Sequence, residues 1–200
     1  MMKNLFQILC GLFLVVSYSS CMHSEEDKVD VLIIGGGASG VTSGIQSARM
    51  GANTLILEES TWLGGMLTSA GVSAVDGNYR LPAGLWGEFK KRLSDYYGGL
   101  DSLKTGWVSN VLFEPSVGNK ILHEMVAAEN NLKVWKQACL EEVKRTGDEW
   151  VAKVKVEGQG VKTVRAKVMI DATELGDVAK MCGVKYDIGM ESRDDTHEDI

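Results

Sequence analysis

A run of three glycines, placed directly after a short apolar segment, constrains this chain more than any other feature. Residues 35–40 have the sequence Gly-Gly-Gly-Ala-Ser-Gly, which fits the pattern G-x-G-x-x-G. The preceding residues 29–34 are almost all apolar, as is typical of a strand buried on both faces of a parallel sheet. A helical pattern follows, with Val41 and Ile45 on its apolar face and Gly51 as its stop.

A second apolar run completes a β-α-β unit of about 30 residues. Residues 54–57 form the second predicted strand, and Glu58 stands at its end. The two strands must be parallel, because a helix connects them. A glycine turn between such elements predicts a dinucleotide-binding site. The alternative is a turn of the same shape that binds no nucleotide, with Glu58 merely solvated.

Each residue of the glycine turn has a predicted role. Gly35 permits the sharp turn, Gly37 lets backbone approach a pyrophosphate, and Gly40 lets helix and strand pack closely. The unpaired N–H groups at the helix start, around Ala38 and Ser39, favour the phosphate charge.

Glu58 narrows the choice of dinucleotide. Its carboxylate can accept hydrogen bonds from ribose hydroxyls and would repel a 2′-phosphate, which argues against NADP. FAD and NAD both remain compatible with the turn.

The remaining pattern predicts an α/β fold. It is a Rossmann-like FAD/NAD(P)-binding domain, in which a parallel sheet carries a small antiparallel β-meander. Helices are expected over residues 85–97 and 119–130, parallel strands over 132–135 and 167–170, and meander strands over 140–145, 150–157 and 161–166.

Two later segments carry a resemblance to a known family. Gly64, Gly65 and Met66 form a second glycine pair soon after Glu58, and Asp171-Ala172-Thr173 follows the last predicted strand. With the glycine turn, they resemble the FAD-dependent oxidoreductase family, which has a glutathione-reductase-like FAD-binding fold and is related to the flavoprotein subunit of heterodisulfide reductase. Glu174 replaces the glycine in the Ala-Thr-Gly signature of two-dinucleotide-binding flavoproteins, whereas bacterial members of the resembled family often carry Asp-Ala-Thr-Glu-x-Gly-Asp at this position.

The resemblance implies a cofactor and a position for each segment. The cofactor would be FAD, with its ADP half held by the glycine turn and Glu58. Gly64, Gly65 and Met66 would lie nearer the pyrophosphate and flavin, and the segment from Asp171 to Thr173 would return to the cofactor. Residues 137–140 would offer backbone groups to adenine.

The expected function is therefore electron or hydride transfer between an organic small-molecule substrate and a flavin, which an electron acceptor then reoxidises. Neither the substrate, the acceptor nor the catalytic residues follow from the sequence. One alternative is an NAD-dependent dehydrogenase, although Tyr96, Tyr97 and Tyr186 lack the lysine four residues on that a Tyr-x-x-x-Lys pair requires. Another is a non-catalytic, nucleotide-binding surface lipoprotein.

Charge and cysteine spacing exclude other classes. The formal net charge of −6 implies no basic surface for nucleic acid. The four cysteines include no C-x-x-C pair and no ferredoxin-type run, so no metal site is expected.

The N-terminal residues predict export. Residues 1–20 carry one basic residue, a short apolar run and small residues, as signal peptides do. Cys21 follows, in an arrangement resembling a bacterial lipoprotein signal, so we expect a lipid on Cys21 as the protein's only membrane contact. A simple cleaved signal and a retained anchor are the alternatives. The protein would then lie in the cell envelope, in the outer membrane or periplasm, where Cys139 and Cys182 could pair.

The expected domain organisation follows from these boundaries. Residues 1–20 are the signal, residues 21–29 an acidic linker, and residues 30–200 an FAD-binding domain. Little chain remains after Asp177 for a substrate region, so further chain is expected C-terminal to this domain.

Overall fold

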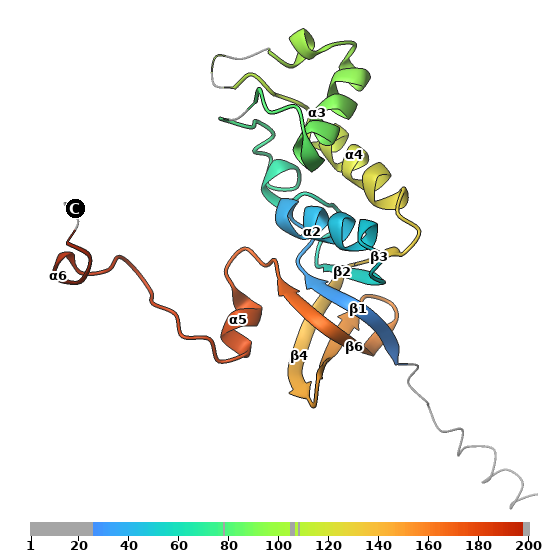
Figure 1. Ribbon diagram of the computed structural model, residues 1–200, viewed down its shortest axis with the longest axis vertical. Coiled ribbons are helices and arrows are strands. Elements are labelled where there is room, and N and C mark those ends of the chain that lie inside the picture. Colours follow the sequence, from blue (N-terminus) through green and yellow to red (C-terminus); the bar gives the residue numbers. More distant parts are fainter. Residues whose placement is uncertain (1–25, 78, 105–106, 108, 198–200) are drawn as a thin grey trace, which may run out of the picture.

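The computed structural model describes residues 26–77, 79–104, 107 and 109–197. The expected signal peptide and the lipid-bearing Cys21 lie outside the described residues. A six-stranded sheet with the order β3-β2-β1-β6-β5-β4 forms the centre of the fold (Figure 1). Its strands are β1 (Asp27–Ile34), β2 (Thr54–Glu58), β3 (Leu132–Lys136), β4 (Ala138–Thr146), β5 (Glu149–Val156) and β6 (Gly160–Asp171).

The sheet has a parallel half and an antiparallel half. Strands β3, β2, β1 and β6 run parallel, whereas β5 is antiparallel to both β6 and β4. The chain adds β2 and β3 on one side of β1 and later adds β6 on the other. The strand order therefore reverses between β1 and β6, which is where open α/β sheets bind their ligands.

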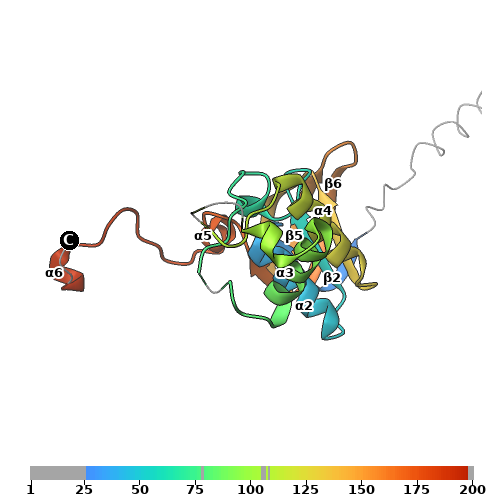
Figure 2. The same ribbon diagram turned by 90° about the horizontal axis from the view of Figure 1, so that it is seen from above.

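Alternate residues of β1 face two different layers. Val31 and Ile33 pack against helices, and Leu32 and Ile34 face the interior of the meander. The helical layer consists of α2 (Ala38–Arg49), α3 (Gly84–Tyr97) and α4 (Pro115–Ala127), with the short turns η1 (Gly65–Leu67) and η2 (Leu100–Leu103) between them (Figure 2). Burial on both faces explains why the sequence of β1 is almost continuously apolar at its carboxyl end.

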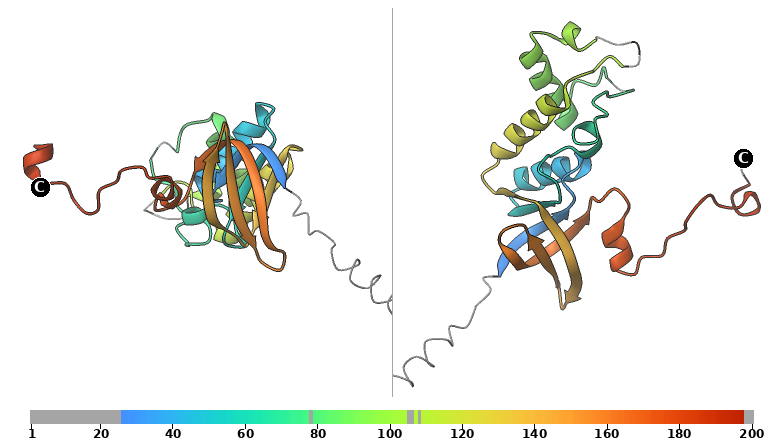
Figure 3. Two further views of the ribbon diagram at one scale, coloured as in Figure 1. Left: turned by 90° about the horizontal axis from the view of Figure 1, so that it is seen from below. Right: turned by 180° about the vertical axis from the view of Figure 1, so that it is seen from behind.

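One long strand replaces two predicted ones. The sequence suggests separate strands over 161–166 and 167–170, but β6 is continuous and changes partners along its length. Its first part pairs with β5, and Val164 to Asp171 pair with β1. Nor is its second part fully buried, because Val168 is 50% exposed. Figure 3 shows the strands β4, β5 and β6 on the face opposite the helices.

Two other boundaries differ from the sequence prediction. Strand β1 begins at Asp27, so the last residues of the expected acidic linker pair with β6. Helix α4 begins at Pro115 instead of residue 119 and ends at Ala127. Proline suits the first helical position because its missing N–H is not needed there. Val117 and Gly118 of this added turn are buried, so packing supports the earlier start.

The C-terminal part contains two short helices. Helix α5 (Asp177–Met181) packs through Val178 on the meander side of the sheet. After α5 the chain runs away from the body of the domain to α6 (Arg193–Thr196) (Figure 1).

Candidate functional site

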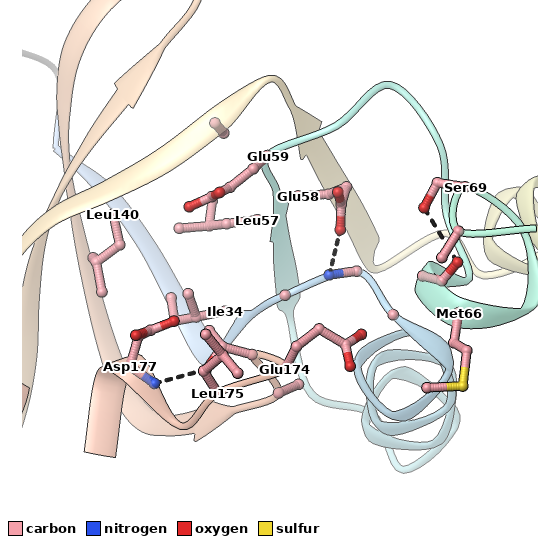
Figure 4. A pocket seen from close by; sticks show the side chains of 18 residues that line it. Ile34, Leu57, Glu58, Glu59, Met66, Ser69, Leu140, Glu174, Leu175 and Asp177 are labelled. Atoms are coloured by element: carbon pink, nitrogen blue, oxygen red, sulfur yellow. Dashed lines mark hydrogen bonds between the residues drawn. The ribbon is translucent and has the colours of Figure 1, made fainter. Parts of the chain in front are cut away.

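A cavity of about 460 Å³ opens where the parallel strands end. Its walls come from the segments after β1, β2 and β6, with η1 and the start of β4 closing the sides (Figure 4). The size lies within the usual range of small-molecule sites, about 300–1,000 Å³. Its position is the reversal point of the strand order, so topology and cavity agree on one location.

The glycine turn forms the floor of this cavity and is tightly packed. The N–H of Gly35 donates to the carbonyl oxygen of Leu57 at 2.9 Å. Gly35 has a φ of +103°, and a Cβ there would lie 2.4 Å from the carbonyl oxygen of Ala172. A Cβ on Gly40 would lie 1.9 Å from the carbonyl oxygen of Gly35. Both positions therefore require glycine, as the sequence predicts.

The N-terminus of α2 points at the cavity without a side-chain cap. Gly37 is the N-cap residue and has no side chain that could accept a hydrogen bond from the N–H groups of the first turn. Ala38 and Ser39 are exposed in the first turn, where backbone N–H groups lack intrahelical acceptors. Such an end attracts an anion, because unpaired N–H groups and the helix dipole act together.

Glu58 lies at the cavity wall and is bound to the glycine turn. Its Oε2 accepts a hydrogen bond from the N–H of Gly36 at 2.8 Å, and its Oε1 accepts one from the N–H of Ser60 at 2.7 Å. A Cβ on Gly36 would lie 2.7 Å from Glu58 Oε2. Gly36 is thus a site residue that the motif misses, since the motif allows any residue there. The available signal was the run of three consecutive glycines, of which Gly36 is the middle one.

The second glycine pair lies beside the first. The N–H of Gly64 donates to the carbonyl oxygen of Gly36 at 2.8 Å, which places the two segments in contact. Gly64 itself is buried against Leu122 of α4 and does not line the cavity. Gly65 and Met66 do line it, and Met66 is 58% exposed.

The three residues predicted at the turn after β6, Asp171 to Thr173, have two different roles. The N–H of Ala172 donates to the carbonyl oxygen of Ile34 at 2.8 Å, and both Ala172 and Thr173 line the cavity. Asp171 instead binds the start of α5. Its Oδ1 accepts from the N–H and the hydroxyl of Thr173 at 3.0 and 2.6 Å, and its Oδ2 accepts from the N–H of Ala179 at 2.8 Å.

These contacts change the acidity of Asp171. Partial burial raises its pKa, but hydrogen bonds from the Thr173 side chain and from the backbone of Thr173, Ala179 and Val178 outweigh burial. The net pKa therefore lies below the ordinary value. Asp171 is a structural anchor of the turn, and it holds Ala172 and Thr173 at the cavity.

Replacing Asp171 with asparagine tests this anchoring. A lowered folded-state pKa means that the carboxylate stabilises the fold above its unfolded-state pKa and that this stability is lost as pH falls through the folded-state pKa. We expect Asp171→Asn to lower the free energy of unfolding at pH 7 by about 2 kcal/mol. Urea denaturation at a series of pH values would measure it. The gap between wild type and variant should shrink in acid, and a gap independent of pH would contradict the assignment.

The start of the meander forms the remaining wall. Ala138 and Leu140 line the cavity. The backbone groups of Gln137 already form hydrogen bonds within the protein. Its N–H donates to the carbonyl oxygen of Ser60, and its carbonyl oxygen accepts from the N–H of Glu157. Since β4 is the last strand of the sheet, its outer edge retains backbone groups without a strand partner.

The part of the chain that the structure describes lines the cavity with acidic side chains. These residues contribute four carboxylates, on Glu58, Glu59, Glu174 and Asp177, and no lysine, arginine or histidine. An anion bound here would therefore depend on backbone N–H groups. Within the described residues, no group of three or more His, Cys, Asp or Glu side chains is arranged to hold a metal ion.

The two described cysteines are unpaired. Cys139 and Cys182 are free and exposed. The Cys139 thiol donates to Glu59 Oε1 at 3.2 Å. Burial raises the pKa of this thiol, and the neighbouring Glu59 carboxylate raises it further. Cys139 is thus not activated as a thiolate at neutral pH.

Comparison with known proteins agrees with this geometry. The family model described as FAD dependent oxidoreductase matches residues 30–199. A search of the curated proteins gave no match.

Among residues 26–77, 79–104 and 109–197, no helix combines the length and apolar character that crossing a bilayer requires.

Solved structures show the same fold at low identity. A flavoprotein/dehydrogenase from Cytophaga hutchinsonii is 21% identical, with a TM-score of 0.53 over 82% of this chain and 44% of its own. A p-nitrophenol 4-monooxygenase from Pseudomonas putida is 15% identical, with a TM-score of 0.52 over 80% and 45%. A geranylgeranyl bacteriochlorophyll reductase-like protein from Thermoplasma acidophilum is 20% identical, with a TM-score of 0.52 over 80% and 43%. The chain thus spans less than half the length of each of these solved proteins.

Proposed function

The chain belongs to the FAD-dependent oxidoreductase family, and from this premise we propose that it binds FAD in the cavity beside the glycine turn and transfers electrons between FAD and an organic small molecule. The observation that carries the proposal is the uncapped N-terminus of α2. Its N-cap residue Gly37 lines a cavity at the reversal point of the sheet, and the N–H groups of its first turn, at Ala38 and Ser39 beside that cavity, lack intrahelical acceptors. A second, unidentified partner would accept the electrons.

The residues present fit the ADP half of this cofactor. Gly37 has no side chain, and a Cβ there would meet only the Glu174 carboxylate within 4 Å, so backbone and pyrophosphate could approach closely. Both oxygens of Glu58 already accept backbone hydrogen bonds, which fixes the carboxylate for further hydrogen bonds from ribose hydroxyls. Its charge also disfavours a 2′-phosphate.

The chain's own contribution is to bind and orient. Bound FAD supplies the redox chemistry, and the protein supplies position and electrostatics. The α2 N-terminus would hold the pyrophosphate, and Gly65 and Met66 would border the path toward the flavin. The outer edge of β4, next to Ala138 and Leu140, would offer backbone groups to adenine. None of these roles requires a catalytic side chain within this segment.

The proposal includes a place in the cell. Its support is the sequence alone: an export signal over residues 1–20 and Cys21 as the lipid site. An exported flavoprotein would meet substrates in the cell envelope, and its membrane contact would be the lipid.

An absorption spectrum of the purified protein, prepared without residues 1–20, tests the proposed function. We expect flavin bands that survive dialysis and bleach on reduction, since a cofactor bound through backbone groups at a tight turn should be retained. The cofactor that denaturation releases from the protein should be FAD and not FMN, because the proposed site is built for a dinucleotide. A folded protein that stays colourless after incubation with FAD would contradict the proposal, and binding of NAD would then be measured.

A further inference from the structure

A carboxylate of the protein itself lies at the position proposed for the pyrophosphate. Glu174, on the turn between β6 and α5, reaches toward the start of α2 and toward η1 (Figure 4). Its Oε1 lies 3.3 Å from the position of a Cβ on Gly37 and 2.9 Å from that of a Cβ on Gly65. The space that these two glycines leave open is thus bordered by a negative charge.

Within the described ranges, no positive side chain of the cavity lining balances this charge. The lining contains Glu174 and three further carboxylates but no lysine, arginine or histidine. Among the described residues, none forms a hydrogen bond or an ion pair with the Glu174 carboxylate. The favourable field acting on it is that of the α2 N-terminus, which is also the field that a pyrophosphate would use.

We propose that Glu174 is an internal competitor for the pyrophosphate of FAD and sets how tightly the protein holds this cofactor. The inference rests on the proposed function. Glu174 and the pyrophosphate are both anions, and the Glu174 carboxylate lies in the space beside Gly37 and Gly65 that is proposed for the pyrophosphate, so binding of FAD must displace the carboxylate or tolerate its repulsion. In either case Glu174 weakens FAD binding relative to a neutral residue at this position.

Displacement needs only a rotation of the side chain. Asp171 fixes the backbone on both sides of Glu174, through Thr173 and through Ala179. The Thr173 hydroxyl also accepts a hydrogen bond from the N–H of Asp177 at 3.0 Å. Glu174 itself is exposed. Because the turn is held by other residues, a substitution of Glu174 should leave the fold intact.

The experiment compares the FAD affinity of three full-length apoproteins by quenching of FAD fluorescence. Glu174→Gln keeps the size of the side chain and removes its charge. Glu141→Gln is the matched control, because Glu141 is an exposed residue of β4 that does not line the cavity. We expect Glu174→Gln to bind FAD about tenfold more tightly than wild type, as removal of a like charge at short range predicts. The control should stay within about twofold, because exposed charges outside the site interact weakly.

Ionic strength provides a second readout. Added salt screens repulsion between exposed charges, so the advantage of Glu174→Gln should shrink as salt rises. Equal affinities of wild type and Glu174→Gln, or an equal gain in both variants, would overturn the inference while leaving FAD binding in place. If none of the three proteins bound FAD although circular dichroism showed each to be folded, the proposed function would fail and the inference with it.

Discussion

Replacing Gly40 with alanine is expected to cost about 3 kcal/mol or more of folding free energy and to abolish retention of the cofactor. The new Cβ would lie 1.9 Å from the carbonyl oxygen of Gly35 and 3.0 Å from its carbonyl carbon. Both are backbone atoms at the most constrained point of the glycine turn, so no rotamer change relieves the clash. The helix must move away from the end of β1, which opens the site. Urea denaturation and the flavin content of the purified protein measure the two effects.

A matched control lies one turn further along the same helix. A Cβ on Gly44 would also be crowded, but only by side-chain atoms, with Ile56 Cδ1 at 2.6 Å, Ile56 Cγ1 at 3.0 Å and Leu132 Cδ1 at 3.3 Å. Alanine additionally gains about 1 kcal/mol of helix propensity over glycine. Gly44→Ala should therefore stay within about 1 kcal/mol of wild type. If Gly40→Ala proved as stable as Gly44→Ala, the close approach of α2 to the turn would be wrong.

The difference between these two glycines shows what sequence alone could establish. Gly40 belongs to a motif whose spacing encodes the contact of helix and strand, so its role was predictable from the sequence. The same is true of Gly35, whereas the role predicted for Gly37 beside a pyrophosphate stays a prediction. Residues 137–140, Gly65 and Met66 were also expected near the cofactor, and the structure places Ala138, Leu140, Gly65 and Met66 at the cavity. The order of the apolar segments along the sequence was sufficient to predict the parallel half of the sheet.

Contacts between segments far apart in the sequence were not predictable. Gly36 contributes to the cavity because its N–H donates a hydrogen bond to Glu58, which is 22 residues away. No local sequence pattern encodes this pairing. Asp171 resembles a cofactor residue in sequence, yet its oxygens face Thr173 and Ala179. The continuity of β6 depends on its having β5 as partner along one part and β1 along another, which alternation cannot show.

Glu174 illustrates the same limit with a consequence for function. In sequence it replaces the glycine of the Ala-Thr-Gly signature of two-dinucleotide-binding flavoproteins, and the sequence assigns it no role. In the structure its carboxylate borders Gly37 and Gly65, which lie more than 100 residues earlier in the chain. The glutamate therefore changes the charge of the proposed cofactor site, and Asp171 holds the backbone of the turn.

Replacing Gly37 with tryptophan is expected to eliminate FAD binding while leaving the domain folded. Gly37 has a φ of −64°, which any residue adopts without strain. Within 4 Å of its Cβ position lies only the end of the flexible Glu174 side chain. The indole would therefore extend into the cavity and occupy the space proposed for the pyrophosphate. We expect FAD affinity to fall at least about a thousandfold, to the limit of detection, because the ligand loses its hydrogen bonds to the α2 N-terminus.

The control must separate blockage of the cavity from the addition of a tryptophan to α2. Gln46→Trp serves, because Gln46 is exposed on the same helix and does not line the cavity. Gly37→Trp and Gln46→Trp should unfold within about 1 kcal/mol of wild type in urea, as surface substitutions usually do. Only Gly37→Trp should lose the flavin bands. Gly40→Ala loses FAD through the fold, whereas Gly37→Trp loses it with the fold intact, and this contrast assigns the binding to the cavity. Retention of FAD by a folded Gly37→Trp protein would show that the cofactor binds elsewhere.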